Sequence, residues 1–308
     1  ECRLMFLNKV INKSINPSSI SNYIKSLISL MKPRVMSLVI FTCAVGFLVS
    51  DPSLKTFDAI ISIILVAMGA GAAGCLNMWY ESDLDALMTR TCLRPIPTGK
   101  VNKRQALTFG ILLSIFSVGA LYYYTNFLSA FLLFFTIAFY LFVYTIWLKR
   151  KTPQNIVIGG IAGSLPPVIG WSISTNSISL VSISLFLIIF FWTPSHFWAL
   201  SLYKADDYKK AKIPMMPITD GIEKTKLYIL IYSLLMLPVV ILPYLVNFSG
   251  LTYLVPTMIL TLYYNFICID LYKHKKNKFD LKKAKKVFAY SILYLFLIFL
   301  LFLLDYLI

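Results

Sequence analysis

The sequence predicts an all-α, polytopic membrane protein with nine transmembrane helices, on two observations. First, 58% of the 308 residues are hydrophobic and only 14% are charged, against about 25% charged residues in a typical soluble domain. Second, the apolar residues form continuous runs near the roughly 20 residues that a helix needs to cross a bilayer. Strands of a transmembrane barrel would have about 10 residues, so these runs exclude a barrel.

Nine apolar runs follow one another along the chain, separated by turn-forming or charged segments. Residues 1–30 precede them as a polar, basic N-terminal arm, and residues 31–308 form the transmembrane domain. The arm has no long apolar core, so it does not match a secretory signal. We expect the spans at about residues 34–50, 57–79, 106–124, 127–147, 156–173, 179–201, 227–247, 251–271 and 288–307.

Positive charge is confined to one side of the predicted bundle. All of the 29 Lys and Arg residues except Lys55 lie in the N-terminal arm through Arg34 or in the segments 90–104, 149–151, 204–226 and 273–286. Because cationic loops stay inside, these segments should be cytoplasmic in a bacterial inner membrane, or on the matrix side of a mitochondrial one. Topology and attraction to anionic lipid explain the net charge of +16, so it requires no nucleic-acid partner.

The end of the second run carries a cluster of polar residues. Asn77, Glu81 and Asp85 are spaced four residues apart and therefore share a helix face, whereas Asp83 points elsewhere. A helix that simply reaches water could also become polar here. However, a basic loop that begins at Arg90 follows, and carboxylates beside such a loop can hold a polyanion bridged by Mg²⁺, which prefers oxygen ligands.

A second polar cluster ends the sixth run, on the same side of the membrane. His196, Tyr203 and Asp207 are spaced to lie on one helix face, and Asp206 is beside them. A polar residue inside a span is costly and often functional. From position alone, His196 is equally well explained as a structural hydrogen-bonding residue or as a ligand.

The stretch around the fifth run adds positive charge and a helix break. Lys149 and Arg150 lie on the same side as the two polar clusters. Gly159, Gly160 and Gly163 form a face of small residues that packing alone could explain. The adjacent Pro166–Pro167 pair should kink or break the helix.

These motifs resemble those of the UbiA superfamily of intramembrane prenyltransferases, from about residue 31 to residue 307. Asn77, Glu81 and Asp85 occupy the superfamily's Asn-x3-Asp-x3-Asp motif, with Glu in the middle. Tyr203 and Asp207 match its second motif, Asp-x3-Asp, with the first carboxylate missing. The departures resemble the haem-modifying branch. The stretches that carry the resemblance are "MKPRVMSLVIFT", "NMWYESDLDALMTRTCLRP", "KRKTPQNIVIGGIAGSLPPVIGW" and "WTPSHFWALSLYKADDYKKAKIPMMP".

The resemblance implies a helical bundle around a central cavity and a Mg²⁺-dependent reaction. Its substrates would be farnesyl diphosphate and haem b, and its product haem O, made for haem-copper oxidases. Haem A synthase or oxidase assembly factors are the protein partners that it suggests. Catalytic roles fall on Asn77, Glu81, Asp85, His196, Tyr203 and Asp207, metal binding on Asn77, Glu81, Asp85 and Asp207, and diphosphate binding on Arg90, Arg94, Lys149 and Arg150. Tyr80, Tyr144, Trp147 and Trp198 are candidates for the cavity wall.

Three other functions fit parts of the sequence. A quinone-precursor prenyltransferase would share the motifs, but His196 and Tyr203 disfavour it. A transporter would place charges at the bilayer midplane, whereas these lie at span ends and no inverted repeat is visible. A scaffold that only holds haem would need no diphosphate site.

Overall fold

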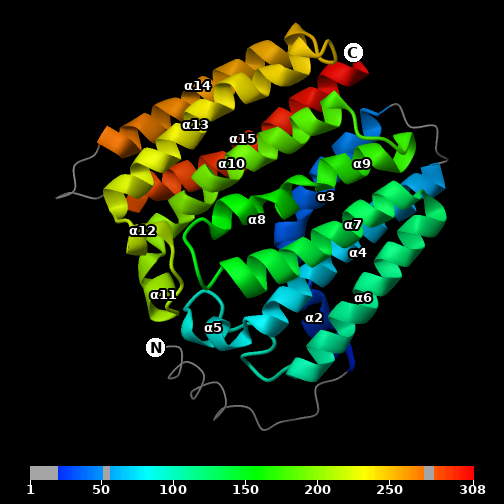
Figure 1. Ribbon diagram of the computed structural model, residues 1–308, viewed down its shortest axis with the longest axis vertical. Helices are drawn as coiled ribbons and strands as arrows, with labels where there is room; N and C mark the ends of the chain where they lie inside the picture. The colour runs from blue at the N-terminus through cyan, green and yellow to red at the C-terminus, as the bar shows by residue number, and fades with distance from the viewer. Residues whose placement is uncertain (1–19, 51–55, 274–280) are drawn as a thin grey trace.

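The computed structural model describes residues 20–50, 56–273 and 281–308, and these ranges contain helices and no strand (Figure 1). Residues 1–19 of the expected arm lie outside the described residues. The helices are α2 (Ile20–Leu30), α3 (Pro33–Leu48), α4 (Thr56–Tyr80), α5 (Ser82–Leu87), α6 (Lys103–Tyr124), α7 (Phe127–Ala138), η1 (Phe139–Leu148), α8 (Asn155–Ser164), α9 (Pro166–Thr175), α10 (Leu180–Tyr203), α11 (Ala205–Lys210), α12 (Met216–Thr219), α13 (Ile222–Leu245), α14 (Leu251–Lys273) and α15 (Leu281–Leu307).

The prediction of an all-α, multi-span fold is confirmed. In the part of the chain that the structure describes, eight helical segments are long and apolar enough to cross a membrane. Helices α2 and α3 meet at 56° and make a ninth span if the bent pair counts as one. The end of the expected arm is therefore helical, and Leu30 of α2 is fully buried against Cys75 and Met78 of α4.

The spans form two packed halves that share α3. One apolar core joins α3, α4, α6, α7 and α9. The other joins α10, α13, α14 and α15, which lie side by side in Figure 1, to α3 and α8. Large apolar side chains such as Ile115, Phe134 and Ile259 remain exposed on the outer helices, which suits contact with lipid.

The proline pair breaks the fifth span as the sequence predicts. Helix α8 ends at Ser164 and α9 begins at Pro166, where the missing N–H of proline costs no helical hydrogen bond. Helix α9 then packs directly on α3. A Cβ atom at Gly170 would lie 2.0 Å from the carbonyl oxygen of Cys43, and one at Gly46 would lie 2.2 Å from that of Pro167. The two glycines therefore permit this close approach.

The fourth span departs from α-helical geometry in its second half. Segment η1 is a π-helix, in which Lys149 N–H donates to the Tyr144 carbonyl five residues earlier. The Thr145 hydroxyl likewise donates to the Tyr140 carbonyl, at 2.8 Å. Such segments are rare and frequently occur at functional sites. This one delivers Thr145 and Lys149 to the acidic motif of α4.

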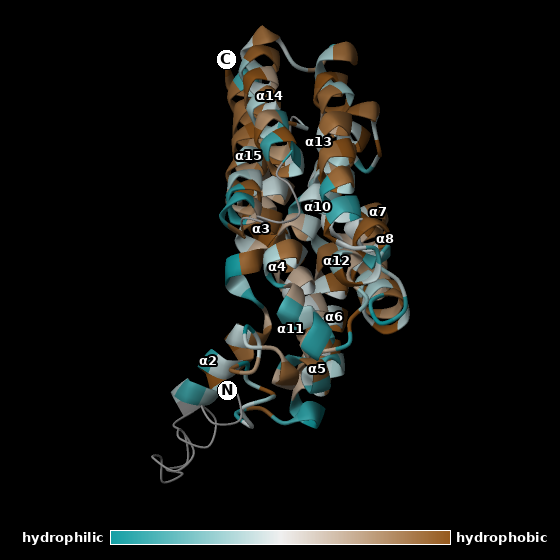
Figure 2. Ribbon diagram, turned by 90° about the vertical axis from the view of Figure 1, so that its left-hand side faces the viewer, coloured by the Kyte–Doolittle hydropathy of each residue, from teal (hydrophilic) through white to brown (hydrophobic). Residues whose placement is uncertain are grey.

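The hydrophilic residues gather at one end of the bundle, where α2, α5 and α11 lie (Figure 2). The short helices α5 and α11 follow the two spans that carry the acidic clusters. Both clusters are therefore at the same end of the molecule, as their places in the predicted topology require.

Candidate active site

Asn77, Glu81 and Asp85 form a buried polar row at the end of α4. They are 2%, 3% and 3% exposed. Helix α4 ends at Tyr80, but the backbone bonds from Glu81 N–H to Asn77 O and from Asp85 N–H to Glu81 O continue the four-residue spacing into α5. The four-residue spacing therefore continues across the break at Glu81, where φ is −92° and ψ is 12°, and all three side chains are buried. Buried polar groups in an apolar helix bundle require hydrogen-bond or ion-pair partners.

Basic side chains from three segments supply these partners. Arg94 Nη1 donates to both carboxylate oxygens of Asp85, at 2.9 and 2.8 Å. Lys149 Nζ lies 2.6 Å from Glu81 Oε2, and Lys32 Nζ donates to Asn77 Oδ1 at 2.7 Å. Burial alone would lower the pKa of Lys149, but the Glu81 carboxylate outweighs it and the net shift is upward. Lys149 is therefore a cation in this pair.

Asp83 and Arg150 lie outside this row. Their side chains pair at 3.0 Å and both are well exposed. Burial raises the pKa of Asp83, but the hydrogen bond from Arg150 outweighs it and the net shift is downward. Arg150 also lies over the Tyr80 ring, 5.1 Å from its centre. The structure thus places Arg150 with Asp83, and not with the buried row that Arg94 and Lys149 contact.

Asp207 connects the second cluster to the first. It is 5% exposed and accepts hydrogen bonds from the hydroxyl and the backbone N–H of Thr89, which lies just after α5. Asp206 is exposed. Arg90, next to Thr89, is exposed and lies close enough to Tyr203 for its charge to act on the phenol. The loop after α5 therefore brings the two predicted motifs together.

One expectation for the second cluster is wrong. His196, Tyr203 and Asp207 do not share a continuous helix face, because α10 ends at Tyr203 and Lys204 leaves the helical region with φ −115° and ψ 19°. Asp207 belongs to the separate helix α11. A spacing of seven and eleven residues places side chains on one face only in an unbroken helix, and the helix is broken at Lys204.

His196 lies deeper in α10 and is 8% exposed. Its ring is stacked between Trp192 and Phe288, with centroid distances of 4.3 and 4.6 Å. Its Nδ1 atom is 2.7 Å from the hydroxyl of Ser291 in α15. The histidine is thus held firmly in one orientation, whichever role it has.

The acidic residues do not form a ready-made metal cage. Among the described residues, no three His, Cys, Asp or Glu side chains are close enough to hold a metal ion. However, Glu81 Oε1 and Asp207 Oδ2 are buried and have no hydrogen-bond partner, which leaves two carboxylate oxygens for a ligand. Mg²⁺ typically takes one or two carboxylates and completes its shell with water and substrate phosphates. The residues therefore fit a metal that arrives with a phosphate ligand.

Sequence reasoning missed several residues of the site. Lys32 adopts a left-handed backbone conformation, φ 54°, at the bend before α3, and such a conformation is uncommon for a residue with a side chain. Thr145 accepts a hydrogen bond from Asn77 Nδ2 at 3.0 Å, and Thr89 binds Asp207. The only early signal was the position of Lys32 next to a proline at the start of a span.

The aromatic candidates separate into different environments. Trp147 is 56% exposed on the outside of the bundle, so it does not line an internal cavity. Trp198 is fully buried against Tyr228 and Tyr232 of α13, at 5.7 and 5.4 Å. Its indole N–H has no hydrogen-bond partner.

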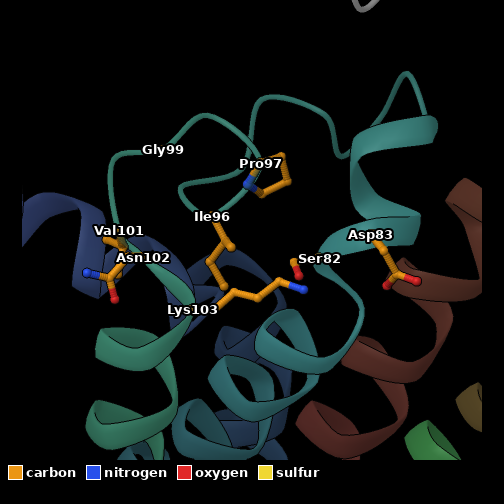
Figure 3. A pocket seen from close by; sticks show the side chains of 8 residues that line it. All are labelled: Ser82, Asp83, Ile96, Pro97, Gly99, Val101, Asn102 and Lys103. Atoms are coloured by element: carbon orange, nitrogen blue, oxygen red, sulfur yellow. The ribbon is translucent and has the colours of Figure 1, made fainter.

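An open pocket of about 270 Å³ lies beside this site (Figure 3). Ser82 and Asp83 of α5 line it together with the loop that precedes α6 and with Lys103. Glu81 and Asp85 are not part of its wall. The pocket is thus on the outer side of α5, away from the buried row.

The fold and motifs are those of a known class of membrane enzymes, and the chain belongs to the UbiA prenyltransferase family, whose model matches residues 38–293. This confirms the resemblance inferred from the motifs. A relative from Pelagibacter ubique (strain HTCC1062) is named protoheme IX farnesyltransferase. It is 70% identical over 301 residues, which cover 98% of this chain and 99% of the relative. A relative of the same name from Azorhizobium caulinodans is 50% identical over 272 residues, covering 88% and 89%.

Solved structures share the fold at low sequence identity. A structure of digeranylgeranylglyceryl phosphate synthase has a TM-score of 0.76 and 17% identity, covering 92% of this chain and 98% of the other. A UbiA homologue from Archaeoglobus fulgidus bound to GPP and Mg²⁺ has a TM-score of 0.66 and 18% identity, covering 90% and 99%. At such identities the similarity supports the fold alone.

Proposed function

We propose that this protein transfers the farnesyl group of farnesyl diphosphate to a vinyl group of haem b, with addition of water, to give haem O and diphosphate. The single observation that carries the proposal is the 70% identity to a protoheme IX farnesyltransferase over nearly the whole length of both chains. The buried acidic row with its surrounding cations supports the diphosphate half of the reaction, and His196 supports a haem acceptor.

Diphosphate binding requires the internal ion pairs to exchange partners. Asn77, Glu81, Asp85 and Asp207 would hold Mg²⁺, which neutralises the charge that develops on the leaving diphosphate. Their present partners would turn to the phosphate oxygens, for which Arg and Lys are suited. These cations are Lys32, Arg94 and Lys149, with Arg90 at the mouth of the site. After the exchange, the carboxylates are paired with Mg²⁺ and the Lys and Arg side chains with phosphate oxygens, so none of these buried groups is left without a partner.

The bond changes follow from the chemistry of an allylic diphosphate. The carbon–oxygen bond of farnesyl diphosphate breaks, and the cations of the site stabilise the departing charge. The terminal vinyl carbon of haem b forms a bond to the farnesyl carbon, and the neighbouring vinyl carbon becomes cationic. Water adds there and releases a proton. The apolar span interior keeps other water away from the allylic cation until the bond has formed.

His196 would act on the acceptor, because its stacked ring lies in the span interior and not in the acidic row. We place the reaction at the cytoplasmic face of a bacterial inner membrane, in line with the positively charged loops and the bacterial relatives. The apolar surfaces of the outer helices would allow farnesyl diphosphate and haem b, which are both hydrophobic, to enter from the bilayer.

The test is an assay of purified protein with haem b, farnesyl diphosphate and Mg²⁺, with and without EDTA. Haem O and diphosphate in equal amounts, both lost with EDTA, are expected. Diphosphate release without haem O would assign a different acceptor, such as a quinone precursor. Haem binding without either product, in folded protein, would favour a haem scaffold, and ion-coupled uptake into vesicles would favour a transporter.

A further inference from the structure

We propose that Ser291 of α15 fixes the tautomer of His196 so that Nε2 carries a free electron pair and binds the iron of the acceptor porphyrin. This inference rests on the proposed function, because it takes an iron porphyrin as the acceptor. Ser291 would act as a positioning residue: it contacts the histidine and not the substrate.

The plane of the His196 ring is fixed from both sides. Trp192 stacks on one face, with 17° between the ring planes, and Phe288 stacks on the other, with 23°. The Trp192 indole N–H donates to the Ser291 backbone carbonyl at 2.8 Å. One residue of α15 therefore anchors both the stacking partner and the imidazole, and the ring cannot turn over without losing its contact to Ser291.

The position of one proton determines the tautomer. The Ser291 hydroxyl lies 2.7 Å from the Phe288 carbonyl oxygen, which can only accept, and 2.7 Å from His196 Nδ1. A hydroxyl has one proton. If it goes to the carbonyl, Nδ1 must carry a hydrogen and donate to the hydroxyl oxygen, and both contacts are satisfied. The other tautomer would leave two oxygen atoms 2.7 Å apart without a proton between them.

The remaining ring nitrogen, Nε2, is then the only basic atom of the side chain. Both faces are covered and Nδ1 is at the Ser291 hydroxyl, so Nε2 is the ring nitrogen left for a ligand; Phe197 packs nearly perpendicular to the imidazole, with the ring centroids 5.1 Å apart. A second proton would place a charge between two aromatic rings in a membrane span, which is costly without a partner. Neutral imidazole is a common iron ligand, and such histidines usually donate their other N–H to a fixed acceptor. The geometry thus favours iron over a proton.

Porphyrin binding with and without iron tests this assignment. Ser291→Ala should weaken the binding of haem b by about 10- to 100-fold, the usual effect of losing the partner of a metal-binding histidine. Binding of metal-free protoporphyrin IX, followed by fluorescence, should not change. Ser184→Ala is the matched control: Ser184 is a buried serine of α10 whose hydroxyl donates to the Val181 carbonyl, at 2.6 Å. Ser291→Thr, which keeps the hydroxyl, should restore haem binding.

A double substitution distinguishes an effect of Ser291 on the orientation of His196 from a general loss of structure. In a His196→Ala background, Ser291→Ala should cause no further loss of haem affinity, because the two residues act as one unit. Equal weakening of both porphyrins, no weakening of either, or additive effects would each overturn the assignment. These measurements need no turnover, so they remain decisive if the wild-type protein proves not to make haem O.

Discussion

The two carboxylate oxygens of Glu81 have different surroundings. One carboxylate oxygen is bound to Lys149 and the other is buried without any partner. A carboxylate with one free oxygen can begin to bind a metal ion through that oxygen while Lys149 still holds the other, before the ion pair is exchanged. This explains how the site can be stable as it stands and still be ready for a metal–diphosphate complex.

Glu81→Gln should therefore lower kcat by about 100-fold or more, the usual loss when one group that stabilises developing charge is removed. The amide oxygen can still accept the hydrogen bond from Lys149, so the fold should be retained. Haem O formation at saturating substrates is the measurement. Asp83→Asn, two residues away on the exposed side, is the control and should stay within a few-fold of wild type. Equal losses in both variants would contradict the site.

Lys32 is expected to bind diphosphate, although no sequence motif points to such a role. Lys32→Met keeps most of the side-chain volume and removes the ammonium group. The KM for farnesyl diphosphate should rise about 10- to 100-fold, as for the loss of a hydrogen bond to a charged group, while the KM for haem b stays constant. Lys25→Met, on the exposed face of α2, should change neither KM. A change confined to the haem KM would refute the assignment.

At the scale of the residue, local spacing revealed some site residues and long-range contacts supplied the others. Asn77, Glu81 and Asp85 are separated by single helical turns, so their common face was readable. The contact between Lys32 and Asn77 spans 45 residues, and that between Thr89 and Asp207 spans 118. No periodicity encodes such pairs, because they arise only when the spans pack.

At the scale of the element, hydrophobic length predicted the spans and missed their irregular parts. The π-helix of η1 has the same apolar composition as an α-helix, so nothing in the sequence of Phe139–Leu148 marks it. The break between α10 and α11 was also missed, because Lys204 is a good helix former. In contrast, the break at Pro166 was predicted, since proline acts through its own covalent structure.

The contact between α3 and α9 should be sensitive to a single methyl group. Gly170→Ala places a Cβ atom against the Cys43 backbone, which cannot move like a flexible side chain, so a loss of about 1–3 kcal/mol in the free energy of unfolding is expected. Gly163→Ala, where a Cβ atom would meet nothing within 4 Å, should be neutral or slightly stabilising. Thermal unfolding in detergent compares the two. Equal unfolding midpoints for the two variants would show that α3 and α9 can move apart to accept the extra methyl group at no cost in stability.

At the scale of the whole molecule, the number of spans determines which ends share a side. If α2 and α3 form one bent span, there are nine spans and the two ends lie on opposite sides. We expect a reporter that fluoresces only in the cytoplasm to be bright when fused at the N-terminal end of the chain, before α2, and dark when fused after Ile308. Alkaline phosphatase fusions should give the reverse pattern. Cytoplasmic signals at both positions would instead support eight spans.

The proposed farnesyl transfer to haem b is tested most directly by running the reaction in H₂¹⁸O with haem b, farnesyl diphosphate and Mg²⁺. The haem product is then analysed by mass spectrometry. The product should be heavier than haem b by one farnesyl group and one hydroxyl group, with the label in that hydroxyl group. Absence of farnesylated haem, or a farnesylated product without the label, would contradict the proposed reaction.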